Sequence, residues 1–120
     1  MPDGHEGIET PKDKNAKFIL TLDNLIVGEL KLENGIWEFQ YSDPFKQQNE
    51  IKPLTDFPQT GKKYRTEELW PFFAFRVPGL NQPHVQEVIK KRSINSGNIV
   101  ELLAAFGRKT ITNPFELQPC

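Results

Sequence analysis

This sequence has little of what most catalytic and metal-binding sites are built from. Its one cysteine is the last residue, Cys120, so no disulfide can form within the chain, as is usual in a reducing compartment. The two histidines, His5 and His84, lie far apart, and no Cys/His cluster has the spacing of metal ligands. The glycines are too scattered for a phosphate-binding loop. We therefore expect no catalytic residues, no cofactor and no metal, and a role in binding.

The chain also lacks a strong net charge and any long hydrophobic run. Its formal net charge is −1 and its pI is near 6.1, so no overall basic field attracts nucleic acid or an anionic membrane. No run approaches the roughly 18 apolar residues of a membrane span. The N-terminus has neither the basic nor the apolar region of a signal peptide. These absences predict a cytoplasmic protein.

The composition divides the chain into a tail and one domain. The 120 residues fit a single domain with a core of its own. Residues 1–16 contain almost nothing apolar, which predicts a disordered tail because there is little to bury against the entropy of ordering. We assign residues 17–120 to the folded domain.

The first half of this domain has the alternation of β-strands. Apolar and polar residues alternate from about 17 to 42, and Asn34-Gly35 is a strong signal for a type I′ hairpin turn. We predict a three-stranded antiparallel meander with Trp37, Phe39 and Tyr41 on one face of its third strand. This face either packs on the core, which we favour, or forms a platform for a ligand.

The second half predicts loops and short helices. Residues 42–63 are rich in turn residues, with a short edge strand expected near 51–56. A helix capped by Thr66 should run to about Arg76, unless Pro71 moves its start closer to Trp70.

Two further helices and a closing strand are expected after this segment. Their ranges are about 84–91 and 99–106, with Gly107 ending the second in a left-handed conformation, and the strand covers 110–117. The predicted fold class is α+β, a small antiparallel β-meander or partial barrel packed with two to three short helices.

An aromatic segment, residues 67–78, is the most distinctive part of the chain. It holds four aromatic residues within six positions, interleaved with two prolines and an arginine, and they would point in several directions around a helix. One face can fill a core, while the rest must meet a second layer or a partner protein, and Trp and Arg often anchor interfaces. The partner-binding candidates are Trp70, Pro71, Phe72, Phe73, Phe75 and Arg76.

Several short motifs occur in an order that resembles a known family. They are LIVGEL at 25–30, WEFQY at 37–41, KPL at 52–54, WPFF at 70–73 and LLAAFGR at 102–108. Together they resemble the first N-terminal subdomain of the HipA family of toxin kinases over about residues 17–119. Residues 74–78, AFRVP, depart from the NLLP that usually follows the double Phe, and 109–114 depart from the usual D—GA. The ATP-binding and catalytic motifs of a HipA kinase are not present in these 120 residues.

The resemblance implies a function. A free-standing version of this subdomain is similar to HipS, the antitoxin of the tripartite HipBST modules, in which the kinase HipT lacks the subdomain and HipB is the DNA-binding partner. It implies that the domain docks at or near the kinase active site with Trp70 as its aromatic anchor. Phe72, Phe73 and Phe75 would divide between core and interface, and Arg76 could pair with a carboxylate of the kinase.

Two other functions stay open at this point. One is an accessory subunit that stabilises a HipA-like kinase without inhibiting it. The other is a small nucleic-acid-binding barrel that stacks bases on Trp37, Phe39 and Tyr41, with basic residues from 62–65 and 90–92. The near-zero net charge disfavours this second alternative.

Overall fold

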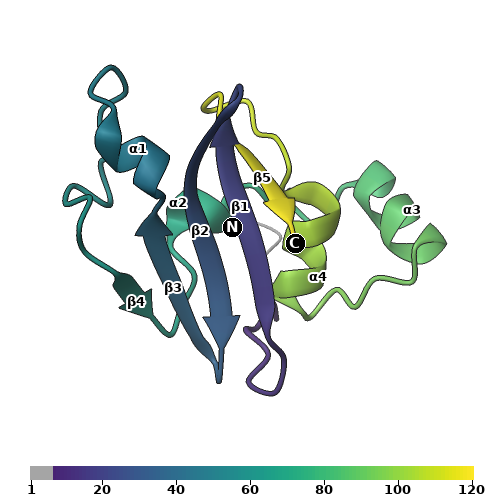
Figure 1. Ribbon diagram of the computed structural model, residues 1–120. Helices are drawn as coiled ribbons and strands as arrows, with labels where there is room; N and C mark the ends of the chain where they lie inside the picture. The colour runs from purple at the N-terminus through teal and green to yellow at the C-terminus, as the bar shows by residue number, and fades with distance from the viewer. Residues whose placement is uncertain (1–6) are drawn as a thin grey trace.

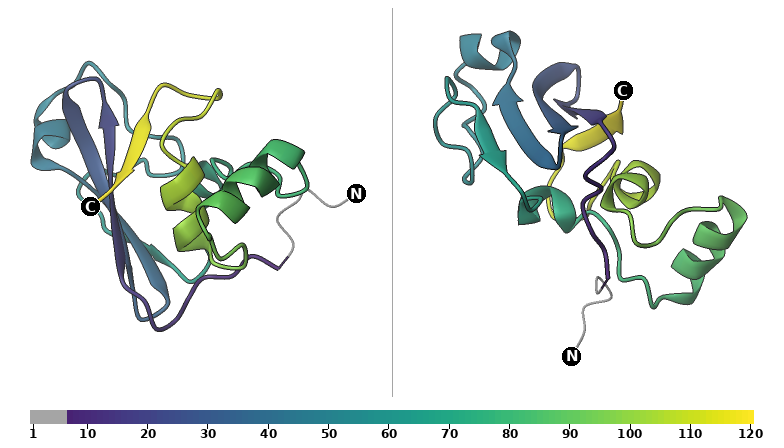
Figure 2. Two further views of the ribbon diagram at one scale, coloured as in Figure 1. Left: turned by 90° about the vertical axis from the view of Figure 1, so that its right-hand side faces the viewer. Right: turned by 90° about the horizontal axis from the view of Figure 1, so that it is seen from below.

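The protein is an α+β domain in which helices cover one side of an antiparallel sheet. The computed structural model describes residues 7–120. The sheet has five strands in the order β4-β3-β2-β1-β5, and α2, α3 and α4 lie on the same side of it (Figures 1 and 2). The elements are β1 (Ala16–Leu22), β2 (Leu25–Glu33), β3 (Ile36–Tyr41), α1 (Asp43–Gln47), β4 (Tyr64–Thr66), α2 (Pro71–Ala74), α3 (Pro83–Lys91), α4 (Ile99–Phe106) and β5 (Glu116–Pro119).

The α+β class is confirmed, and the sheet is open rather than closed into a barrel. β4 and β5 are its two edges, so the described strands do not close on one another. The described residues hold four helices, not the two or three expected. The additional helix is α1, whose five residues are too few to show a helical periodicity in the sequence.

The predicted meander is confirmed as β1, β2 and β3. Asn34 and Gly35 both have positive φ, at 51° and 79°, as a type I′ turn requires, and Asp23 has φ 52° in the preceding turn. Alternate residues of the strands point to the helices and form the inner face of the sheet. The core is built mainly from Phe18, Leu20, Leu30, Leu32, Trp37, Phe39, Phe73, Leu102, Leu103 and Leu117.

The segment between β3 and β4 is organised by one tyrosine. The hydroxyl of Tyr41 donates to the carbonyl of Phe57 at 2.6 Å and accepts from the amide of Leu54 at 2.8 Å. The prediction of a short strand near 51–56 is wrong, since these residues are irregular, with a turn at 55–56, and the Leu54 amide donates to the Tyr41 hydroxyl. The strand that pairs with β3 is instead β4, which includes Thr66.

Thr66 is therefore not a helix cap, because it lies in a strand. The helix that follows begins at Pro71 and has four residues, so the expectation of a helix from Thr66 to Arg76 is wrong in its length. Pro71 occupies the first helical position, so the alternative start close to Trp70 is confirmed.

The two later helices are confirmed, with one error at their end. Asn98 caps α4 by accepting hydrogen bonds from the amides of Val100 and Glu101. Gly107 ends α4 with φ −86°, not in the left-handed conformation that we expected. A glycine is still needed there, because a Cβ would lie 2.5 Å from the carbonyl oxygen of Leu103.

Residues 7–15 and 107–120 both make backbone contacts with the rest of the described domain. The closing strand is β5, Glu116–Pro119, and pairs with β1, whereas residues 110–115 form a loop rather than the start of a strand. Residues 1–6 of the expected tail lie outside the described residues. Within the rest, Glu9 pairs with the backbone beside α4, and Thr10 accepts a hydrogen bond from the Trp37 indole at 3.1 Å.

Candidate protein-binding site

The aromatic segment forms α2 and the turns on either side of it. Pro71 is the first helical residue, where its missing N–H would have had no partner and its fixed φ suits the helix. The amides of Phe73 and Ala74 both donate to the carbonyl of Trp70, at 3.0 and 2.9 Å. The helix ends after one turn, at Ala74, and residues 75 and 76 continue as a turn. The result is a tight turn with side chains on all sides.

The four aromatic residues of this turn differ in burial. Phe73 is fully buried, and its ring centroid lies 5.6 Å from that of Phe39 on the inner face of the sheet. Trp70 and Phe72 are half-buried, whereas Phe75 is 72% exposed. The segment is thus divided between core and surface, as its pattern indicated. Phe73 is the residue that fixes it to the core.

Trp70 lies at the border between the core and the surface. Its ring packs edge-on against Phe57, with centroids 5.0 Å apart and an interplanar angle of 86°. The backbone of Phe57 is in turn held by the Tyr41 hydroxyl. Trp70 therefore has a supported side and an accessible side. A rigidly supported aromatic side chain loses little entropy when a partner covers its free face.

Phe75 and Pro71 form the outward side of the same turn. They are four residues apart, which places them on one face, and both are exposed. A phenylalanine that is 72% exposed contributes little to the core of the domain. Its apolar area becomes favourable only when another surface covers it.

Arg76 is buried within the domain. It is only 4% exposed, and its guanidinium donates four hydrogen bonds inside the domain. Nη1 donates to the carbonyls of Gly107 and Arg108 at 3.1 and 3.3 Å, and Nη2 donates to Asn113 Oδ1 and the Phe115 carbonyl at 3.2 and 2.9 Å. These four hydrogen bonds hold the guanidinium inside the domain, and the pairing of Arg76 with a carboxylate of a partner stays a prediction.

This buried arginine joins α2 to the end of the chain. The Arg76 Cζ lies 5.7 Å from the centre of the Phe72 ring. The Phe72 ring packs in turn against the Phe115 ring, with their centroids 6.2 Å apart. Burial lowers the pKa of Arg76, but an arginine still remains charged at neutral pH. The sequence carried no signal for this arrangement, since the acceptors lie 31 to 39 positions away. Phe73 is also fully buried.

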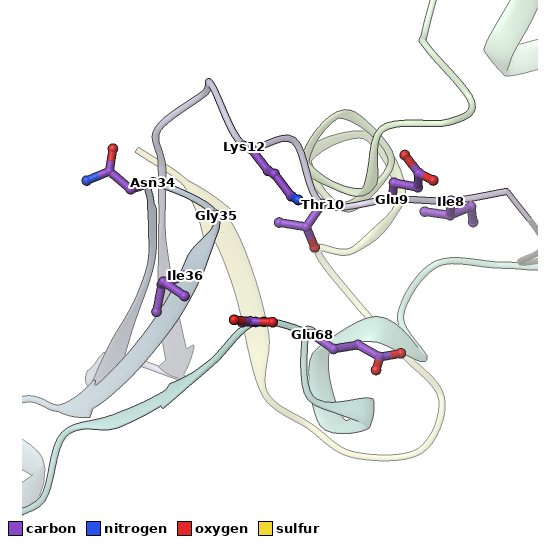
Figure 3. A pocket seen from close by; sticks show the side chains of 9 residues that line it. Ile8, Glu9, Thr10, Lys12, Asn34, Gly35, Ile36 and Glu68 are labelled. Atoms are coloured by element: carbon purple, nitrogen blue, oxygen red, sulfur yellow. The ribbon is translucent and has the colours of Figure 1, made fainter.

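A polar cleft lies next to the site, on the N-terminal side of Trp70. It has a volume of about 620 Å³ and is bounded by residues 8–12, by the turn at 34–36 and by Glu67 and Glu68 (Figure 3). Both glutamates are exposed, and Thr10 is engaged by the Trp37 indole. A small-molecule site is usually enclosed and mostly apolar. We therefore assign this cleft no ligand.

The sheet does not offer a platform for nucleic acid bases. Trp37, Phe39 and Tyr41 are at most 2% exposed and face the helices, so no base can stack on them. The alternative of a nucleic-acid-binding barrel, which relied on these three residues, is therefore not supported. The prediction that they form a core face is confirmed.

Residues 7–120 contain neither a cluster of metal ligands nor a helix that could span a membrane. In this part of the chain no three His, Cys, Asp or Glu side chains come together as metal ligands would. Within the same residues, no helix has the length and hydropathy that crossing a membrane requires.

Comparison with known proteins gives one family. A search of curated proteins finds no match. The model of the HipA N-terminal domain matches residues 19–112, a range that includes most of the meander and all of α2, α3 and α4. The matched unit is the N-terminal domain rather than the kinase domain, which fits a role in binding. Because the match covers most of the sequence, this chain belongs to the HipA N-terminal domain family.

Proposed function

We propose that this protein is an antitoxin that binds a HipA-type serine/threonine kinase toxin and neutralises it by docking at or near its active site. The family match supports a HipA-related role. The observation that carries the proposal is the burial pattern of the turn at α2. Phe73 fixes the turn to the core, while Trp70 and Phe75 keep apolar surface in solvent. Supported aromatic side chains of this kind are typical anchors of protein interfaces.

The proposed mechanism is steric. A kinase active site must hold its nucleotide, metal ions and catalytic groups in exact positions for phosphoryl transfer. A rigid turn that inserts Trp70 and Phe75 near this cleft would exclude a substrate or hold the kinase in an inactive conformation. By the family resemblance the partner is a HipT-like kinase, and a HipB-like DNA-binding protein could complete a ternary complex.

Growth assays with the kinase test this proposal. The HipA-type kinase from the same genome is expressed alone, with the wild-type protein, and with Trp70→Ala or Phe75→Ser. We expect the wild type to restore growth and both variants to lose most of this protection. Phe75→Ser is the stricter variant, because the side chain is 72% exposed and its loss should leave the fold intact. The matched control is Ile26→Ser, at another exposed apolar residue, outside the aromatic segment.

Circular dichroism and binding measurements complete the experiment. A variant that binds the kinase at least tenfold more weakly while its spectrum is unchanged supports the proposal. Full protection by both variants would remove the α2 turn from the mechanism. A stable complex in which the kinase stays toxic would instead favour an accessory subunit that does not inhibit.

A further inference from the structure

The loop between α4 and β5 presents an isoleucine to solvent at its tip. Ile111 is 105% exposed, more than the two other large hydrophobic residues exposed in the described part of the chain, Phe75 at 72% and Ile26 at 49%. A single exposed apolar side chain is common on soluble proteins. The significance of Ile111 depends on how its loop is built and on what lies beside it.

The base of this loop is held by the buried guanidinium. Arg76 binds the carbonyls of Gly107 and Arg108 where the loop begins, and the carbonyl of Phe115 where it ends. A loop whose two ends share one buried cation has little freedom to move as a whole. Its position relative to α2 is therefore set within the domain.

The tip of the loop has hydrogen bonds of its own. Asn113 Oδ1 accepts from the amide of Phe115 at 3.1 Å, which forms an Asx turn. The hydroxyls of Thr110 and Thr112 lie 3.2 Å apart, one on each side of Ile111. The residue between them is thus displayed on an ordered turn, although it contributes nothing to the core.

The loop lies next to the aromatic segment, residues 67–78. Phe115, at the end of the loop, contacts Phe72 of α2, and the Arg76 guanidinium lies between the two elements. Figures 1 and 2 show the loop leaving α4, passing the end of the sheet and returning to it as β5. A protein that covered the outward side of α2 would therefore meet this loop as well.

The charge next to Ile111 indicates the chemistry of the surface it would meet. Arg108 is paired with Glu116 at 3.3 Å, whereas Lys109 is exposed and forms no ion pair with any residue from 7 to 120. A free cation beside an apolar side chain suits a surface where carboxylates border an apolar pocket. Kinase active sites carry such carboxylates, since aspartates hold the metal ions and orient the nucleophile.

We infer that residues 108–113 form a second contact with the kinase, with Ile111 as an apolar anchor and Lys109 as the partner of an acidic residue at the cleft. This inference rests on the proposed function and extends it from α2 to the end of the chain. Arg76 is the positioning residue that holds the two contacts in a fixed relation without touching the kinase.

Affinity measurements with the purified kinase test the inference. Ile111→Ser should raise the Kd about tenfold, because an apolar anchor is lost while the fold keeps all its internal contacts. Lys109→Ala should slow association several-fold at low salt and have less effect at high salt, as expected for a charge at the rim of an interface. Ile26→Ser is the control and should leave both constants unchanged.

The outcomes separate this inference from the proposed function. Weaker binding by Ile111→Ser with an unchanged thermal midpoint supports it. If Trp70→Ala and Phe75→Ser weaken binding but Ile111→Ser and Lys109→Ala do not, the second contact is wrong and the proposed function stands. If the wild-type protein does not bind the kinase at all, both are overturned.

Discussion

The two faces of the sheet stabilise the protein by different means. On the outer face, charged residues of neighbouring strands pair with one another. Lys17 lies 3.3 Å from Glu29, and Glu38 lies 3.8 Å from Lys31 and 2.8 Å from Arg65. On the inner face the strands bury aromatic and aliphatic side chains against the helices. The charged residues of the outer face therefore find partners on that face, whereas the apolar residues of the inner face depend on the helices that cover them.

Arg65 and Arg76 show this difference in their exposure and in their partners. Arg65 has a side chain that is 66% exposed and one carboxylate partner, Glu38. Arg76 is 4% exposed and has four acceptors from the segment that follows α4. An exposed ion pair adds little stability because water solvates both charges well. A buried cation that satisfies several carbonyls decides where whole segments lie.

The same comparison bears on binding. A face whose charges are already paired gains little from a partner, which must displace those pairs. On the helical side, by contrast, the turn at α2 leaves the apolar side chain of Phe75 exposed to solvent. We therefore place the proposed kinase contact on the helical side and not on the outer face of the sheet.

The largest expected effect is from Arg76→Ala. Its loss takes the Arg76 donor from the carbonyls of Gly107 and Phe115, while the Arg108 carbonyl and Asn113 Oδ1 each keep one backbone amide donor, so the free energy of unfolding should fall by about 3 kcal/mol. Urea unfolding measures this loss. Arg65→Ala is the matched control on the outer face and should cost at most about 1 kcal/mol. Equal losses for the two variants would contradict the contrast between the faces.

The next effect is at alkaline pH and concerns Tyr41. Burial raises the pKa of Tyr41 to about 12, against the hydrogen bond from the Leu54 amide, which lowers it. The unfolded chain ionises at a pKa near 10, so the stability that this phenol contributes is complete below pH 10. It is lost as the pH rises towards 12. The two-unit difference corresponds to at most about 3 kcal/mol.

Tyr41→Phe isolates this dependence. The variant should be less stable at neutral pH, because Leu54 N and Phe57 O lose their partner, but it should lack this part of the alkaline loss. Unfolding free energies measured at pH 8 and pH 11 give the comparison. Tyr64→Phe, which leaves Tyr41 in place, is the control. An identical alkaline loss in Tyr41→Phe and the wild type would show that other groups cause it.

The smallest effect is expected on the outer face, from Glu38→Gln. Partial burial raises the pKa of Glu38, but the hydrogen bond from Arg65 and the charges of Lys31, Arg65 and Lys63 together outweigh it and lower the pKa. The stability from this carboxylate is therefore present above its unfolded pKa and lost as the pH falls. We expect a loss of at most about 1 kcal/mol at pH 7, reduced by salt.

A second glutamate gives the control for this variant. Glu33 pairs with Lys31 at 3.6 Å, its one ion pair among residues 7–120, and is more exposed than Glu38, so Glu33→Gln should have a still smaller effect. Unfolding at pH 7 and pH 4, at low and high salt, measures both variants. A loss above about 2 kcal/mol for Glu38→Gln would mean that the outer face contributes as much as the inner one.

Local patterns predicted the elements that local physics controls. The meander followed from alternation and from Asn34-Gly35, whose backbone suits a hairpin turn on its own. The start of α2 at Pro71 likewise followed from a local property, the preference of proline for the first turn of a helix. Errors occurred where distant groups decide. The irregular segment at 51–56 depends on the Tyr41 hydroxyl, and Gly107 is needed for its closeness to Leu103 rather than for its φ.

For the candidate site, the sequence identified the segment but not the roles within it. It showed by itself that four clustered aromatic residues exceed what one face of a helix can bury. Only the tertiary structure decided that Phe73 belongs to the core, that Phe75 remains exposed and that Arg76 binds the chain's own carbonyls. Periodicity reports which residues share a face, whereas burial and hydrogen bonding depend on segments that folding brings together from more than thirty positions away.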